Sequence, residues 1–383
     1  MIRVLLSLCI FSLFACSHAQ ELELGASRMD QYLHLLENKR VGLVVNQTSV
    51  INTTHLVDTL LSRGVNVVKV MAPEHGFRGE APDGAKIDDA KDEKTGLPII
   101  SIYGKSKKPS PEMLEDLDVL IFDIQDVGIR FYTFISTMHY VMEAAAENGK
   151  KVIVLDRPNP NGMYVDGPVK DDDINSFVAM HPIPVVHGLT VGELALMINA
   201  EGWLKDGVKS DLTVISMAGW DHTKTYSLPI SPSPNLPTDN AITLYPSLGF
   251  FEGTVVSVGR GTDFPFEVIG HPDYSKGTFS FTPKPNQGSK YPPLEDELCV
   301  GKFFGNETAK HELNLSYLLE YHNDLKDDTT FFRPYINILS GTKSFKEQVE
   351  LGWTEEQIKA TWQPKLNAYK AMRKKYLLYS DFE

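Results

Sequence analysis

Val41-Gly-Leu-Val-Val45 is the first of four short apolar runs that decide the fold, and the others are Val65-Asn-Val-Val-Lys-Val70, Val119-Leu-Ile-Phe122 and Val152-Ile-Val-Leu155. Each run is apolar almost without interruption instead of alternating with polar residues. This pattern is typical of strands that are covered on both faces, as the strands of a parallel sheet are. The runs therefore predict a buried, mostly parallel sheet.

Helical segments separate these runs. Helices are predicted over 55–62, from Ser110-Pro111 onward, and over 132–147. Thr190-Val-Gly-Glu193 is a capping box that opens a further helix through Asn199, so we interpret Glu193 as a cap and not as a catalyst. Strands that alternate with helices indicate βαβ units, and the sequence therefore predicts an α/β fold with a mostly parallel sheet.

The length of 383 residues, 42% of them hydrophobic, favours two domains, because single cores rarely grow beyond about 250 to 300 residues. Prolines cluster after Trp220, and we place a boundary near residue 238. The predicted domains are 20–238 and 239–383, the second being smaller and of the α+β class.

The second domain is expected to mix short strands with helices. Strands are predicted over 255–258 and 278–282, and a helix around 313–321. A terminal helix opens at Thr354-Glu-Glu-Gln357. It carries a stripe of apolar residues that is expected to pack inward, namely Ile358, Trp362, Leu366 and Tyr369.

Charge and cysteine content exclude several classes of protein. Fifty acidic side chains against thirty-seven basic ones give a formal charge of -13, which argues against nucleic acid as a partner. The three cysteines are too few for a zinc quartet of thiolates or a disulfide framework.

The first nineteen residues are interpreted as an export signal. Arg3 precedes an apolar run over 4–15 that is too short to span a bilayer. Leu13-Phe-Ala-Cys16 is similar to a bacterial lipobox, which would make Cys16 the lipidated N-terminus and anchor the protein to a membrane of the cell envelope. The alternative is a soluble secreted protein cleaved after Ala19.

Polar residues follow each predicted strand, where ligands bind in open parallel sheets. They are Asn46 and Gln47, the loop 73–80, Asp123, Gln125, Asp126 and Arg130, Asp156, Arg157 and Asn159, and finally His187 after a fifth short run over 184–186.

The corner Glu74-His75-Gly76 can present a carboxyl group in a confined pocket, where Glu74 would serve as a general acid. Alternatively, Glu74 caps the next element. Asp123 and Asp126 also have a catalytic and a structural interpretation. In the structural one, either could cap a helix or pair with Arg130. Likewise, Arg130, Arg157 and Arg260 could each bind an anionic group or neutralise a neighbouring aspartate.

Other mechanisms lack their motifs. Asp123 and Asp126 are three residues apart, whereas phosphatases with an aspartate nucleophile need Asp-x-Asp. The sequence contains no His-Glu-x-x-His, no Gly-x-Ser-x-Gly and no phosphate-binding loop. Two carboxylates acting without metal or cofactor remain as the catalytic template.

Six blocks, in this order, resemble the exo-β-N-acetylmuramidase (NamZ) family, formerly a bacterial domain of unknown function, DUF1343. They are Gly42-Leu-Val-Val-Asn-Gln-Thr48, Pro73-Glu-His-Gly-Phe-Arg-Gly79, Phe122-Asp-Ile-Gln-Asp-Val-Gly-Ile-Arg-Phe-Tyr-Thr133, Asp156-Arg-Pro-Asn-Pro160, Ser233-Pro-Asn-Leu-Pro237 and 253–261. The resemblance implies a Rossmann-like N-terminal domain, a smaller C-terminal domain, and a cleft between them that removes terminal N-acetylmuramic acid from peptidoglycan fragments.

With this resemblance, the expected function is an exo-acting glycoside hydrolase of the cell envelope. The expected catalytic residues are Glu74, His75, Asp123 and Asp126, with Glu74 as the acid. The expected substrate-binding residues are Asn46, Gln47, Arg78, Arg130, Asn159, Asn235 and Arg260, and Arg130 is the first choice for the lactyl carboxylate of the sugar. The alternative is an envelope lipoprotein that binds muropeptides or glycans for uptake without catalysis.

Overall fold

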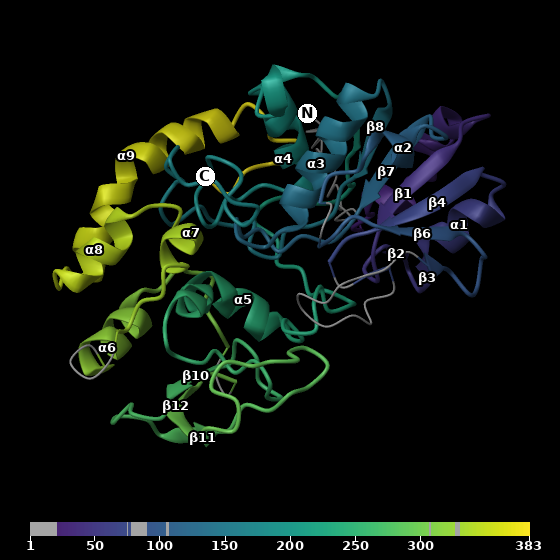
Figure 1. Cartoon of the computed structure of the whole chain (residues 1–383). Helices are drawn as coiled ribbons and strands as arrows, with labels where there is room; N and C mark the ends of the chain where they lie inside the picture. Colours follow the sequence, from purple (N-terminus) through teal and green to yellow (C-terminus); the bar gives the residue numbers. More distant parts are fainter. Residues whose placement is uncertain (1–20, 75, 78–89, 105–106, 306–307, 326–329) are drawn as a thin grey trace, which may run out of the picture.

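The computed structural model of the chain describes residues 21–74, 76–77, 90–104, 107–305, 308–325 and 330–383 (Figure 1). A large sheet fills the N-terminal part, and a small three-stranded sheet lies in the C-terminal part. The predictions for Cys16, His75 and Arg78 fall outside the described residues. Within the described residues, no helix combines the length and apolar character needed to cross a membrane.

The large sheet has seven strands in the order β5-β6-β4-β1-β7-β8-β9. Their bounds are β1 Val41–Val45, β4 Val67–Ala72, β5 Ala90–Lys91, β6 Pro98–Ser101, β7 Val119–Asp123, β8 Lys151–Leu155 and β9 Asp211–Ile215. The pairings of β1, β4, β6, β7, β8 and β9 are parallel, and β5 pairs antiparallel with β6 at the edge. Numbered along the chain, the six parallel strands have the order 3-2-1-4-5-6 of the Rossmann fold, which confirms the predicted fold class.

Helices cover both faces of this sheet, and this explains the continuous apolar runs. Leu43 and Ile121 face the core that contains Leu56 and Leu60 of α1, whereas Val44 faces the core of α3 and α4. The helices here are α1 Leu56–Ser62, α2 Pro111–Leu114, α3 Phe134–Glu147 and α4 Val191–Ala200. Short elements complete the domain: β2 Val50–Ile51, β3 Thr54–His55 and the 3-10 helices Gly25–Ser27, Met29–Gln31, Leu33–Leu36 and Lys205–Gly207.

Details of the predicted elements differ from the structure. The capping box of Thr190 and Glu193 is present, as expected. In contrast, α3 begins at Phe134 and not at 132, because Tyr132 closes a turn with the carbonyl of Ile129. The run 184–186 is no strand; Val186 forms single bridges to Ile129 and Asp166.

The C-terminal part begins with α5, which Thr238 caps through the amide of Ala241. Its elements are α5 Asp239–Leu248, the 3-10 helix Gly249–Gly253, β10 Val268–His271, β11 Phe279–Phe281, β12 Cys299–Phe303, α6 Ser316–Leu325, α7 Ile336–Ser340, α8 Ser344–Glu350 and α9 Glu355–Arg373. The strands form an antiparallel sheet in the order β10-β12-β11. The predicted strand 255–258 is wrong, because this segment makes one bridge, from Ser257 to Gly270.

The end of the chain returns to the N-terminal domain. Helix α9 has the predicted capping box, and its apolar stripe is buried. Beyond it, the hydroxyl of Tyr379 donates to Asp156 at 2.6 Å, and the amide of Leu378 donates to Glu193 at 2.8 Å. Arg373 binds Asp381 at 2.8 Å, so this tail, residues 374–383, is fixed at several points. Figure 1 shows α9 (yellow) curving back toward α4.

Candidate active site

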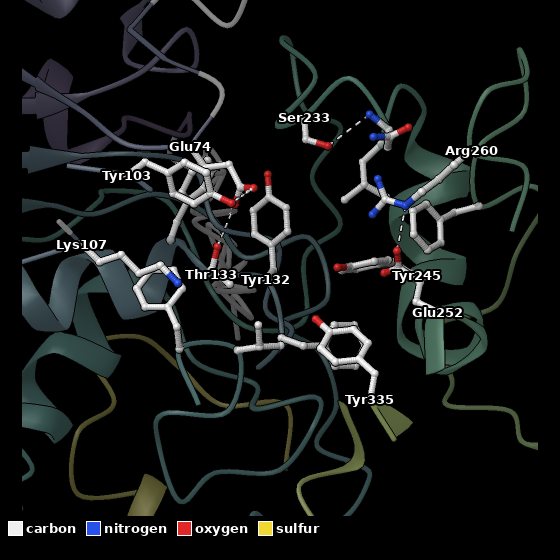
Figure 2. Close-up of a pocket in the computed structure, with 17 residues that line it drawn as sticks. Glu74, Tyr103, Lys107, Tyr132, Thr133, Ser233, Tyr245, Glu252, Arg260 and Tyr335 are labelled. Carbon is white, nitrogen blue, oxygen red and sulfur yellow. Dashed lines mark hydrogen bonds and ion pairs between the residues drawn. The ribbon is translucent and has the colours of Figure 1, made fainter. Parts of the chain in front are cut away.

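A pocket of about 310 Å³ lies where the sheet domain meets the C-terminal part. Residues that follow β4, β6 and β7 form one wall, and residues of α5 and the 249–266 segment form the other (Figure 2). The lining residues are Glu74, Tyr103, Lys107, Phe131, Tyr132, Thr133, Phe134, Phe177, Val178, Ser233, Asn235, Leu236, Tyr245, Glu252, Arg260, Phe266 and Tyr335. Glu74, Asn235 and Arg260 are the residues in this set that the sequence singled out.

Glu74 is held by two hydroxyl groups. Its position follows β4, and the hydroxyl of Tyr103, which follows β6, donates to Oε1 at 2.5 Å. The hydroxyl of Thr133, directly before α3, donates to Oε2 at 3.1 Å (Figure 2). Because the two neighbouring parallel strands end at the same edge of the sheet, they bring Glu74 and Tyr103 together. The carboxyl group is therefore fixed in orientation at the pocket wall.

The opposite wall carries an ion pair. Nε of Arg260 donates to Oε1 of Glu252 at 2.7 Å, and the guanidinium lies 5.2 Å from the centroid of the Phe266 ring (Figure 2). Asn235 is buried, and its amide donates to the carbonyl of Gly288 at 2.7 Å. Glu74 and Glu252 are the two carboxyl groups among the described lining residues.

Aromatic rings line the pocket between these walls. Tyr245 packs edge to face against Phe131, Tyr132 and Phe266, with ring centroids 5.1, 6.2 and 4.9 Å apart. Such contacts fix the rings and leave apolar faces beside polar groups. A pocket with this mixture suits a small ligand that has both hydroxyl groups and apolar faces.

Most of the other predicted site residues lie outside this pocket, although they follow strands of the same sheet. Asp123 is fully buried, and Arg157 binds both its oxygens at 2.5 and 2.8 Å. Asp126 accepts a hydrogen bond from the amide of Gly128 at 2.8 Å and lies 3.6 Å from His187. Both carboxylates thus lie outside the pocket, and both oxygens of Asp123 are paired with Arg157, whereas Oδ1 of Asp126 is buried without a hydrogen-bond partner in the described part of the chain.

The amides predicted to bind substrate also have internal partners. Asn46 accepts from the amide and hydroxyl of Thr48, and Asn159 donates to the carbonyl of Leu189 at 2.8 Å. Gln47 donates to the carbonyls of Ser231 and Pro232, each at 3.2 Å. This contact places the 231–232 segment against the loop that follows β1.

Arg130, the first choice for the substrate carboxylate, is 1% exposed. Its guanidinium donates to the carbonyls of Pro168, Ile183 and Leu339 at 2.7 to 2.9 Å. Burial lowers its pKa to about 9. Arg130 does not line the pocket, and its position is that of a structural cross-link between three segments.

A buried polar cluster outside the pocket lies at the start of α4. Asp156 accepts from Thr190, Gly192, Arg157 and Tyr379, while His222 lies 3.0 Å from Glu193. Burial, and then the charge of Glu193, raises the pKa of Asp156 to about 6. This cluster joins the tail to the sheet domain and lies apart from the pocket-lining residues.

Several lining residues were not predicted from the sequence, among them Tyr103, Lys107, Thr133, Tyr245 and Glu252. Thr133 ends one of the six blocks, and Tyr103 follows the apolar run 97–102, so the rule on strand ends would have pointed to both. No comparable local signal marks Glu252 or Lys107. Within the described residues, no group of three or more His, Cys, Asp or Glu side chains could hold a metal ion.

The chain is similar in sequence to proteins of one known family. Residues 41–240 match the family "Exo-beta-N-acetylmuramidase NamZ, N-terminal", and residues 243–379 match its C-terminal counterpart. The chain is 39% identical to the peptidoglycan β-N-acetylmuramidase NamZ of Bacillus subtilis (strain 168), and the match covers 92% of this chain and 89% of that protein.

Two crystal structures of DUF1343 family proteins from Bacteroides fragilis NCTC 9343 have the same fold. One has a TM-score of 0.88 at 44% identity and covers 94% of this chain and 100% of the other. The second has a TM-score of 0.80 at 31% identity, with 94% and 99% covered.

Proposed function

This chain belongs to the exo-β-N-acetylmuramidase NamZ family, and we propose that it is a glycoside hydrolase that releases terminal N-acetylmuramic acid from peptidoglycan fragments. The observation that carries the proposal is Glu74, oriented by Tyr103 and Thr133 in the wall of the pocket. A cavity of about 310 Å³ is at the small end of ligand sites, which run from about 300 to 1,000 Å³. That size favours a single terminal sugar over a long glycan chain.

In this proposal, Glu74 is the general acid that protonates the leaving glycosidic oxygen, and water is the acceptor. Hydroxyl groups both donate and accept, so Tyr103 and Thr133 can serve the protonated and the ionised form of Glu74 in turn. Glu252, on the opposite wall, is the candidate for the second carboxylate of the two-carboxylate scheme. Its ion pair with Arg260 would keep it fixed while substrate binds.

Purified protein incubated with a muramic-acid glycoside tests the proposal. We expect sugar release by the wild type and a loss of about 10² to 10⁴-fold in Glu74→Gln, because the amide keeps the shape and delivers no proton. Asp123→Asn is no suitable control because Asp123 is paired with Arg157; exposed Glu347→Gln serves instead.

Binding without turnover by the wild type would favour the alternative, a lipoprotein that only captures glycans. If Glu74→Gln keeps a kcat within about threefold of the wild type on a substrate with a poor leaving group, Glu74 is not the general acid.

We also propose that the enzyme works in the cell envelope, anchored through lipidated Cys16. The basic and apolar signal before Leu13-Phe-Ala-Cys16 supports this location. Cell fractionation tests it: the wild type should sediment with membranes, and Cys16→Ser should lose that association or its processing. A wholly soluble wild type that begins at Gln20 would instead identify the secreted form.

A further inference from the structure

Lys107 brings a positive charge into the pocket without a carboxylate partner in the described part of the chain. Its side chain lines the same pocket as Glu74. Its Nζ lies 4.2 Å from the centroid of the Phe177 ring, which is a cation–π contact. The ring attracts the ammonium group but carries no net charge, so the positive charge stays available to an anionic ligand.

Other cations around the site are neutralised by the protein. Arg260 pairs with Glu252 on the wall opposite Glu74. Lys108, the neighbour of Lys107 in the chain, binds Glu143 and Glu147 of α3 at 2.7 and 2.6 Å. Lys107 differs from both, because its one described interaction is with an aromatic ring.

The Phe177 ring that holds Lys107 is itself fixed. The hydroxyl of Ser136 donates to the Phe177 carbonyl at 2.6 Å. The Tyr140 ring stacks on the Phe177 ring, with centroids 6.0 Å apart and planes at 14°. Both partners belong to α3, the helix that follows Thr133. The ammonium group is thereby placed on a rigid support, which lowers the entropy cost of using it for binding.

We infer that Lys107 binds the lactyl carboxylate of N-acetylmuramic acid and so determines the preference for this sugar over N-acetylglucosamine. The inference rests on the proposed function, in which the ligand is an acidic sugar. The protein has a formal charge of -13, and its pocket walls carry Glu74 and Glu252, so the general field repels such a ligand. Recognition of the carboxylate therefore needs a local positive charge, and Lys107 supplies it.

Paired kinetics on muramic-acid and glucosamine glycosides with the same leaving group test this role. Lys107→Met keeps most of the aliphatic stem and removes the charge. We expect it to lower the ratio of kcat/KM for the two glycosides by about 10-fold, through a higher KM for the muramic-acid glycoside alone. Lys107→Arg should keep most of the preference.

The matched control is Lys290→Met, which makes the same change of net charge. Lys290 is exposed, lies 5.7 Å from the Tyr291 ring and does not line the pocket. It should leave the ratio unchanged. Phe177→Leu provides a second variant, which keeps Lys107 but removes its support, and it should shift the ratio in the same direction by a smaller factor.

An active wild type whose preference survives in Lys107→Met would overturn the inference, as would equal losses on both glycosides. A wild type that hydrolyses neither glycoside would instead overturn the proposed function. Raising the salt concentration should narrow the preference of the wild type more than that of Lys107→Met, since charge pairing is screened by ions.

Discussion

Removing the hydroxyl group of Tyr103 from the pocket wall tests whether Glu74 acts as the general acid. Tyr103→Phe deletes the oxygen that donates to Oε1 of Glu74 at 2.5 Å and keeps the ring in place. A hydrogen bond to a charged group contributes about 1.5 to 3 kcal/mol. If the whole contribution is needed in the transition state, kcat/KM falls about 10 to 150-fold.

Substrates with different leaving groups show whether this loss of kcat/KM concerns proton donation. A sugar or alkyl leaving group needs a proton from the acid, whereas an activated phenol departs with little help. Tyr103→Phe should therefore lose the full factor on a muramic-acid disaccharide or alkyl glycoside, and far less on an activated aryl glycoside. Thr133→Val removes a longer bond, 3.1 Å, and should lose less on the same substrate.

The two hydroxyl groups act on one carboxyl group, so their effects should not add. The double variant should lose no more than Glu74→Gln. Equal losses on both leaving groups, or wild-type rates in Tyr103→Phe, would refute the idea that Tyr103 positions a proton donor. The measurement is kcat/KM for each variant on both substrates, with the melting temperature checked for each.

Two further predictions concern the buried residues outside the pocket. The pKa of Asp156 is about 6 in the folded protein, above its usual 3.8, so folding retains a proton that the unfolded chain releases, and stability falls as the pH rises from about 4 to 6. Asp156→Asn should flatten this decline, by up to about 3 kcal/mol, in denaturation curves compared with the wild type; an unchanged slope would contradict it. Arg130→Met should remove the guanidinium donor of three carbonyls, of which that of Ile183 keeps the amide of Lys170 at 3.3 Å, and cost about 3 kcal/mol of unfolding free energy. It should not alter the preference between muramic-acid and glucosamine glycosides, and a 10-fold change in that ratio would return Arg130 to substrate binding.

The sheet could be predicted because each strand of its centre touches two cores. Leu43 and Val44 are neighbours in the chain and face opposite sides, so the sequence is apolar at both positions. The segment 255–258 has a similar apolar sequence but does not form a strand. Gly259 and Gly261 follow it with φ of +78° and +81°, and these left-handed residues turn the chain away after one bridge.

Site residues could be predicted only at a strand end that opens into the pocket and is not buried by other parts of the chain. Glu74 follows β4 and lines the pocket, whereas Asp123 is the last residue of β7 and is buried against Arg157. Gln47, after β1, contacts Ser231, which lies 184 residues further along the chain. No pattern around residue 47 reveals that contact. Glu252 depends in the same way on long-range packing, since it follows no strand of the sheet. Lys107 lies six residues beyond the end of β6, too far from the strand for the strand-end rule to mark it.

The attachment of the tail has a consequence for how the molecule is made. Asp156 and Glu193 belong to the N-terminal domain, yet they receive hydrogen bonds from Tyr379 and Leu378. While the chain is being synthesised, these buried carboxylates lack the two donors near its C-terminal end, because those residues are made last. The N-terminal domain therefore cannot reach its final structure as an independent early unit. Assembly is completed only after almost the entire chain is available, and a chain truncated before Leu378 would leave two buried acidic groups short of donors.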